Sequence, residues 1–204
     1  MHKRLAWQKQ DLTMRIEGYI EKYLQGRLSH AETTEKLAMQ IYEKLRRQKQ
    51  IPELPKLLGY GALLHDIGMC ISPLEHNKIG ANIIVRDGIE GLSEDEVYVV
   101  ACLVRYHRGG TPKKTHKKYS VLNKDLQNTV KIYSSIIRLA DALDWKHKNF
   151  IDNIDIKIDK NNAVLTLHGK TDIIMKSGFL KFFGKKKEYF EKVFKLSLTL
   201  KTSD

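Results

Sequence analysis

The sequence of 204 residues predicts a mainly α-helical protein, a helical bundle followed by a small β-β-α-β subdomain. Apolar residues recur at intervals of three and four through roughly the first 150 residues, which is the helical period. Beyond that point the period becomes two, because Ile154, Ile156 and Ile158 alternate with charged residues as in a half-buried strand. We therefore expect a helical domain over residues 1–150 and a small α+β appendage over residues 151–204.

Helix start and stop signals define the helical elements in order. Helix starts are expected at an N-cap at Ser29, at capping boxes over 72–75 and 93–96, and at an N-cap at Asn123. A short apolar helix is expected over 57–67 and should end at Gly68, and Gly109-Gly110 should end the helix that begins after 93–96. The last of these caps should begin the longest helix, which carries Leu126, Val130 and Ile137 at helical spacing.

The appendage is expected to consist of two strands, a helix and a last strand. These elements are a strand through Ile154–Ile158, a turn at 159–162, a strand over 163–168, a helix around 185–194 and a strand over 195–200. Aromatic residues are frequent from Phe179 to Phe194, and we expect them to form core, with a homodimer face as the alternative.

Composition excludes several classes of protein. Cys70 and Cys102 are the only cysteines, so no disulfide framework and no four-cysteine zinc site is expected. No apolar stretch approaches the ~20 residues of a membrane span, and the basic N-terminus has no hydrophobic region behind it, so we expect a cytoplasmic protein without a membrane partner. Lys and Arg exceed Asp and Glu by 36 to 24, which favours polyanionic partners.

Several His and Asp residues occupy positions on apolar helix stripes, where burial of a charge or an imidazole costs several kcal/mol without a partner. They are His30, His65, Asp66, His76, His107 and Asp141. A divalent metal ion would satisfy all of them together. Because the set contains nitrogen and oxygen donors and no thiolate, it suits Mn, Mg, Fe or Zn.

Each of these residues also has an ordinary structural explanation. A single histidine on an apolar stripe is more often a hydrogen-bonded core residue than a ligand. Asp141 has an alternative role as a cap or as the partner of Arg138, and Asp144 is a competing acid on the same helix. The recurrence of the pattern on five predicted helices favours a metal site.

The order His30, His65-Asp66, Asp141 resembles the HD superfamily of metal-dependent phosphohydrolases. A closer resemblance covers nearly the whole chain: GALLHDIG, LVRYHRGGTPK and IIRLADALDWKH, followed by the β-β-α-β tail, are similar to the C-terminal domain of the exopolyphosphatase/guanosine pentaphosphate phosphatase (Ppx/GppA) family. The ATPase-like domain that carries exopolyphosphatase chemistry in that family does not precede these segments here. Its processive cleavage of polyphosphate is therefore not expected of this chain.

The resemblance implies that His30, His65, Asp66 and Asp141 are the four HD metal ligands. His76 and His107 occupy positions where related two-metal proteins place further histidines, and Lys78 matches a basic residue. The family commonly runs His-His-Lys-His-Ser where this sequence has residues 76–80 as His-Asn-Lys-Ile-Gly. Two imidazoles that would serve a second metal are thus missing.

The resulting hypothesis is a phosphohydrolase for a nucleotide or a polyphosphate-like compound. Asp66 would serve as ligand and proton acceptor, and positive charge near the phosphoryl group would come from Lys78, Arg105, His107 and Arg108. The stretch 105–124 carries seven cations and no acid, which indicates a basic loop beside the pocket or simply a solvated loop. The alternatives are a non-catalytic module that binds polyphosphate or nucleotide and, less favoured, a nucleic-acid binder.

Overall fold

The computed structural model describes residues 13–171 and 178–203. The chain is mainly helical with a small sheet at its C-terminal end, which confirms the predicted fold class. The helices are α1 (Ile16–Tyr23), α2 (Leu28–Arg46), α3 (Pro55–Leu63), the 3-10 helix η1 (Ile67–Cys70), α4 (His76–Asp87), α5 (Glu94–Tyr106), α6 (Lys117–Ser120), α7 (Lys124–Leu143) and α9 (Phe179–Phe194). The strands are β1 (Ile151–Asp159), β2 (Asn162–Gly169) and β3 (Ser197–Thr202).

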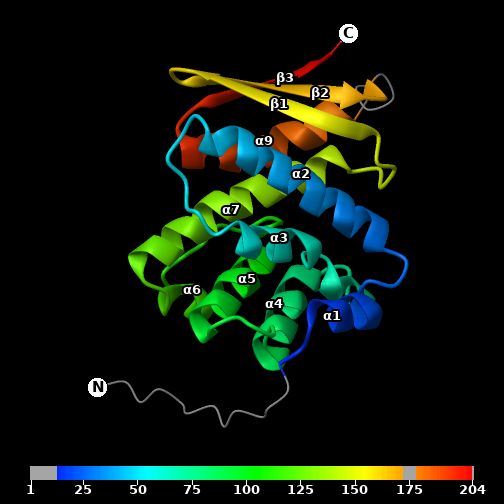
Figure 1. The fold of residues 1–204 in the computed structure, drawn as a ribbon, viewed down its shortest axis with the longest axis vertical. Coiled ribbons are helices and arrows are strands. Elements are labelled where there is room, and N and C mark those ends of the chain that lie inside the picture. The colour runs from blue at the N-terminus through cyan, green and yellow to red at the C-terminus, as the bar shows by residue number, and fades with distance from the viewer. Residues whose placement is uncertain (1–12, 172–177, 204) are drawn as a thin grey trace.

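The elements form layers (Figure 1). The sheet lies at one end, α2, α7 and α9 lie beneath it, and α3 to α6 lie at the other end with α1. Strand order is β1-β2-β3, with β1 antiparallel to β2 and β2 parallel to β3. A parallel pair needs a crossover connection, and α9 provides it. The predicted β-β-α-β order is therefore confirmed.

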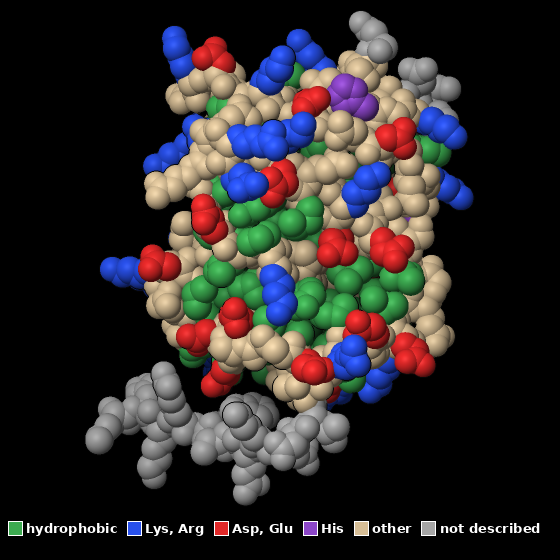
Figure 2. Space-filling model, viewed as in Figure 1, with side chains coloured by type: hydrophobic (Ala, Val, Ile, Leu, Met, Phe, Trp, Pro, Cys, Tyr) green, Lys and Arg blue, Asp and Glu red, His purple; other side chains and the backbone are tan. Residues whose placement is uncertain are grey.

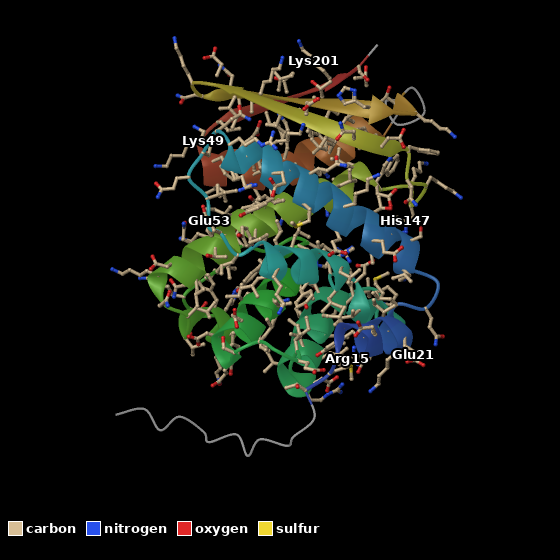
Figure 3. All side chains as sticks on the ribbon, in the orientation of Figure 1. Arg15, Glu21, Lys49, Glu53, His147 and Lys201 are labelled. Atoms are coloured by element: carbon tan, nitrogen blue, oxygen red, sulfur yellow. The ribbon has the colours of Figure 1, made fainter. Side chains whose placement is uncertain are left out.

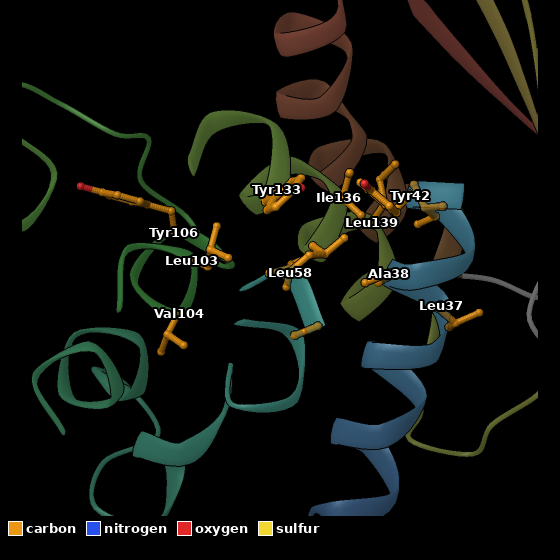
Figure 4. Close-up of a cluster of buried hydrophobic side chains, with 14 of the residues drawn as sticks. Leu37, Ala38, Tyr42, Leu58, Leu103, Val104, Tyr106, Tyr133, Ile136 and Leu139 are labelled. Carbon is orange, nitrogen blue, oxygen red and sulfur yellow. The ribbon is translucent and has the colours of Figure 1, made fainter. Parts of the chain in front are cut away.

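The hydrophobic core runs without a break from the helical layers to the sheet. Its centre, shown in Figure 4, brings α2, α3, α5 and α7 together through Ala38, Leu58, Leu103 and Ile136. Phe179 and Phe190 of α9 are fully buried, so the aromatic segment contributes to the core as expected. A core of this extent fixes the relative positions of the helices that carry the polar residues discussed below.

Two of the expected helix caps are confirmed. Ser93 accepts a hydrogen bond from the backbone of Glu96 while the Glu96 carboxylate accepts one from the Ser93 backbone, which completes the capping box of α5. The Asn123 side chain accepts a 2.9 Å bond from the backbone N–H of Leu126 at the start of α7. Both caps satisfy backbone donors that a helix N-terminus leaves free.

Two other caps were predicted wrongly. Helix α2 begins at Leu28, so Ser29 lies inside its first turn, and the side chain of Arg27 makes no capping bond. Helix α4 begins at His76 after Glu75, again without a side-chain cap, so the proposed box at 72–75 does not form. Tertiary packing holds both helix starts in place of the local caps.

The short apolar helix and the elements around it also differ from the prediction. Helix α3 ends at Leu63, and His65 and Asp66 lie in the turn that leads to η1 instead of on the helix. Helix α1 was not predicted, although Tyr19 and Tyr23 are buried at helical spacing on it. At the other end of the chain, α9 begins at Phe179, earlier than expected, and α6 interrupts the stretch that was expected to be one basic loop.

Gly68 has a different role from the expected helix stop. A Cβ at this position would overlap the backbone carbonyl oxygen of His76 and would lie 2.8 Å from the backbone nitrogen of Gly80. The absence of a side chain therefore lets η1 lie directly against α4. This close approach brings the turn that carries Asp66 next to the first residue of α4, His76.

On the face shown in Figure 2, Lys and Arg side chains are interspersed with Asp and Glu around a central area of hydrophobic side chains. The positive charge excess does not form a continuous patch there.

None of the helices among the described residues combines the length and the apolar character needed to span a membrane.

We predict that Gly68→Ala destabilises the protein by roughly 1–3 kcal/mol, because the added methyl group forces η1 away from α4. The free energy of unfolding in urea measures this change. The matched control is Gly184→Ala in α9, where a Cβ meets no atom within 4 Å; this change should be neutral or stabilising by about 0.5–1 kcal/mol. A Gly68→Ala protein as stable as the wild type would contradict the proposed close contact.

Candidate metal centre

The structure brings all six of the sequence-predicted His and Asp residues together. They come from α2 (His30), the turn after α3 (His65, Asp66), the first residue of α4 (His76), the end of α5 (His107) and the last turns of α7 (Asp141). Their donor atoms form two overlapping groups of metal-ligating geometry, His30 with His65 and Asp66, and Asp66 with His76 and His107. Asp66 belongs to both groups.

The distances between donor atoms are short. Oδ1 of Asp66 lies 3.4 Å from Nε2 of His76, 3.6 Å from Nε2 of His65 and 3.9 Å from Nε2 of His107. Oδ1 of Asp141 lies 3.5 Å from Nε2 of His30 and 3.9 Å from Nε2 of His65. Bonds of about 2.0–2.2 Å to one ion place neighbouring ligand atoms about 3–3.5 Å apart, so these spacings need only small adjustments.

Local backbone bonds orient three of the imidazoles in the same way. Nδ1 of each ring lies 2.7–2.8 Å from the carbonyl oxygen three residues earlier, in His65 to Ala62, His76 to Pro73 and His107 to Val104. A carbonyl oxygen only accepts, so Nδ1 carries the proton in each case. The lone pair of each Nε2 therefore points into the cluster, which is the arrangement that metal-bound histidines show.

Two features of the cluster are of the kind that a bound cation would stabilise. Nε2 of His76 and Nε2 of His107 lie 3.1 Å apart, and with both protons on Nδ1 two lone pairs face each other. Nε2 of His65 is buried and has no hydrogen-bond partner among the described residues. An unpaired buried acceptor costs free energy, and a shared ion removes this cost at all three rings. The donor set therefore fits a divalent metal ion.

The electrostatics of the cluster favour negative carboxylates and a neutral His107. Burial raises the pKa of Asp66, but the surrounding imidazoles of His65, His107 and His76 outweigh burial and lower it below its ordinary value. Burial, assisted by His65, lowers the pKa of His107 to about 3. Asp66 is thus charged and His107 is neutral at physiological pH, which are the protonation states of metal ligands.

His30 is held differently, between two carboxylates. Its Nδ1 donates a 2.8 Å hydrogen bond to Oδ2 of Asp144, and its Nε2 faces Asp141. Burial opposes the charged ring, but these hydrogen bonds outweigh burial and raise the pKa of His30 to about 9. In the metal-free protein His30 is therefore protonated at neutral pH.

The structure separates the roles of the two competing acids on α7. Asp141 faces the cluster, whereas Asp144 orients His30 and accepts bonds from the backbone N–H groups of Lys148 and Asn149. Arg138 does not pair with Asp141; its guanidinium donates to the carbonyl oxygens of Tyr106 and Gly110. Asp144 therefore fixes the orientation of the His30 ring from the side away from the cluster, as carboxylates do behind the histidines of metal sites.

Three groups at the cluster were not predicted from the sequence. Nη1 of Arg27 lies 3.5 Å from Oδ2 of Asp66, and Nζ of Lys186 donates a 2.9 Å bond to Oδ2 of Asp141. His147, labelled in Figure 3 beside the N-terminal half of α2, stacks on His30 with ring centroids 3.8 Å apart. Lys186 follows Phe179, Phe182 and Phe183 by seven, four and three residues, so helical spacing places it on the buried stripe of α9 and could have indicated this contact.

The three predicted arginine and lysine residues lie in two different places. Arg108 is at the edge of the cluster, with Nη1 3.2 Å from the carbonyl oxygen of Pro73 and 3.3 Å from Nδ1 of His76. Lys78 instead pairs with Glu75 at 2.5 Å, and both Lys78 and Arg105 line a separate cavity.

Comparison with known families agrees with the architecture. Residues 19–180 match the family model for Ppx/GppA phosphatase, domain III. The chain belongs to this family. The match includes every His and Asp of the cluster and ends before Lys186, so the α9 lysine is a feature of this chain outside the matched segment. The matched segment therefore contains all six His and Asp side chains of the cluster, whose geometry could hold a metal ion.

We predict that the protein loaded with Mn²⁺ and then desalted retains about one ion per chain or more, and that Asp66→Asn abolishes retention because Asp66 belongs to both ligand groups. Elemental analysis by mass spectrometry measures the ratio. The control is Asp95→Asn, an exposed acid on α5. Equal metal content in the two variants would show that the ion does not bind at the cluster.

We also predict a pH dependence of stability in the metal-free protein. A histidine whose pKa rises from 6.5 to about 9 on folding stabilises the fold fully below pH 6.5, and this stabilisation disappears as the pH rises through about 9. The loss corresponds to roughly 3 kcal/mol. Urea unfolding between pH 6 and 10 in EDTA should show this slope in the wild type and in His168→Gln on β2, and a flatter profile in His30→Gln. Identical slopes in all three proteins would contradict the assignment.

Proposed function

We propose that this domain III protein is an HD-type metal-dependent phosphohydrolase that cleaves a phosphate ester or anhydride of a nucleotide or a polyphosphate-like compound. The observation that carries the proposal is the convergence of three Nε2 lone pairs, on His65, His76 and His107, around the buried carboxylate of Asp66. Each of these rings is fixed by a backbone carbonyl group, so the set is preorganised for a cation and not merely buried.

His30, His65, Asp66 and Asp141 would hold the first ion, and His76 and His107 would complete the set with Asp66 if a second ion binds. When bound, a divalent ion polarises a phosphoryl oxygen and lowers the pKa of a water molecule. Asp66 is the carboxylate closest to all three carbonyl-fixed rings, and its low pKa keeps it available as an acceptor of a water proton.

Cationic side chains at the cluster are suited to stabilise the charge of a phosphoryl group. Arg27 keeps about a third of its side chain exposed beside Asp66, and Arg108 is exposed beside His76. Guanidinium groups bind phosphate oxygens with two parallel hydrogen bonds, which suits a transition state with charge spread over several oxygens. Lys186 is more buried and pairs with Asp141, so its main effect is to keep that carboxylate ionised.

We predict that the Mn²⁺-loaded protein releases phosphate from at least one member of a panel of nucleotides and inorganic oligophosphates. Asp66→Asn should lower kcat by roughly 100-fold or more, and Arg27→Gln or Arg108→Gln should lower kcat/KM by about 10-fold. Lys113→Gln, a change of one exposed cation on the loop after α5, is the control and should leave both constants unchanged.

Absence of hydrolysis across the panel by a protein that retains the metal would overturn the enzymatic proposal. The alternative is then favoured, a non-catalytic module that binds polyphosphate or nucleotide. The exposed cations Lys113 and Lys114 between α5 and α6, and Lys117 at the start of α6, support this alternative. This alternative requires salt-sensitive polyanion binding that survives Asp66→Asn and fades when Lys113 and Lys114 are neutralised, together with the absence of hydrolysis.

A further inference from the structure

A cavity lined by cationic side chains lies on the side of the α4–α5 pair that faces away from the candidate metal centre. It has a volume of about 280 Å³ and is lined among others by Lys78, Asn82, Arg105, Lys117 and Lys118. This volume is at the small end for ligand-binding cavities and suits a small ion or a group of a few linked phosphates. None of these side chains belongs to the His and Asp cluster.

The helical period explains why the two sites are separate. Lys78 follows His76 by two residues, and Arg105 precedes His107 by two residues. Two positions correspond to about 200° around a helix, so on each helix the cation and the imidazole project in nearly opposite directions. The amide of Asn77 also donates a 2.9 Å bond to the carbonyl oxygen of Arg105, which holds α4 and α5 in this relative register.

The cavity has an excess of cations over acids. Among the described residues, Lys78 pairs with Glu75, but Arg105, Lys117 and Lys118 have no carboxylate oxygen within 4.0 Å. Lys118 is half-buried and its ammonium donates to Oδ1 of Asn82 at 2.7 Å, so the neutral amide fixes its position without neutralising it. Burial lowers the pKa of Lys118 and the charge of Arg105 contributes, as expected for cations held close together.

A second feature restricts the kind of ligand. Two aromatic rings line the cavity, Tyr106 and His116. Tyr106 is only 2% exposed, and the two rings are stacked on each other with centroids 5.7 Å apart, which leaves only the small imidazole ring for stacking on a base. The hydroxyl of Tyr106 lies 2.6 Å from Nδ1 of His116, which holds the imidazole at the cavity wall. The cavity thus offers charge and hydrogen-bond donors but little stacking surface.

We infer that this cavity is a second anion site, in which Arg105 and Lys118 bind the phosphoryl groups of an oligophosphate independently of the metal centre. The Arg105 guanidinium supplies a forked donor and Lys118 a point charge, which together match the oxygens of adjacent phosphates. Because recognition is of the phosphates and not of a base, inorganic triphosphate and guanosine triphosphate should bind with affinities within about threefold of each other.

The test uses the full chain in EDTA, so that the metal centre does not contribute, and calorimetric titration with inorganic triphosphate. We expect Arg105→Gln/Lys118→Gln to raise Kd at least tenfold. Two matched double variants each remove two cations elsewhere. Lys113→Gln/Lys114→Gln, on the same segment outside the cavity, should change Kd less than twofold, and Arg27→Gln/Arg108→Gln, at the metal centre, should raise Kd clearly less than the cavity variant does.

Equal losses in all three variants, or a loss confined to the metal-centre variant, would overturn the inference, as would absence of binding by the wild type. A guanosine triphosphate affinity tenfold or more above that of triphosphate would overturn the assignment of a base-independent site. If the cavity variant fails to fold, an NMR titration of the wild-type protein tests the same site. The NMR signals of the His116 ring should shift on titration with triphosphate while those of His147 do not, and an unshifted His116 would also contradict the site.

Discussion

The buried carboxylate of Asp66 is the group around which the helices of this protein have to be arranged. Removal of a carboxylate from water costs several kcal/mol unless cations or hydrogen-bond donors replace the lost hydration. Here the neighbours are imidazoles whose Nδ1 protons are already donated to backbone carbonyls, so their Nε2 atoms present lone pairs instead of donors. These three rings therefore bring no positive charge to Asp66. The protonated ring of His30 faces Asp141, the side chains of Arg27 and Lys186 pair with Asp66 and Asp141, and a divalent ion would balance the remaining negative charge.

This constraint explains several features of the packing that have no local cause. Gly68 allows η1 to contact α4 closely enough for Asp66 to reach His76. Helix α9 packs on α7 and brings Lys186 to Asp141, so the C-terminal α+β part contributes to a site formed otherwise by the bundle. The division at residue 150 stays a prediction about domain organisation, but the charge balance of the site extends across that division.

The same two helices separate the proposed reaction chemistry from the proposed anion binding. On α4 and α5, the residues that face the cluster alternate with residues that face the cavity on the other side, because the helix turns by about 100° per residue. The separation matters for electrostatics. Arg105, on the far side, can attract anions without pairing with the carboxylates of the cluster, whereas Arg27 and Lys186 pair with them directly.

The sequence by itself determined the helical class, the sheet at the end of the chain, the caps at Ser93 and Asn123, and the His and Asp residues of the cluster. Each of these follows from periodicity or from a polar side chain on an apolar stripe, and both signals are local. The role of Asp144 in orienting His30, the contacts of Arg27 and Lys186, and the position of Arg105 away from the cluster were decided by the tertiary structure alone. They depend on which neighbouring element a side chain meets, and a helical period specifies the direction of a side chain but not its partner.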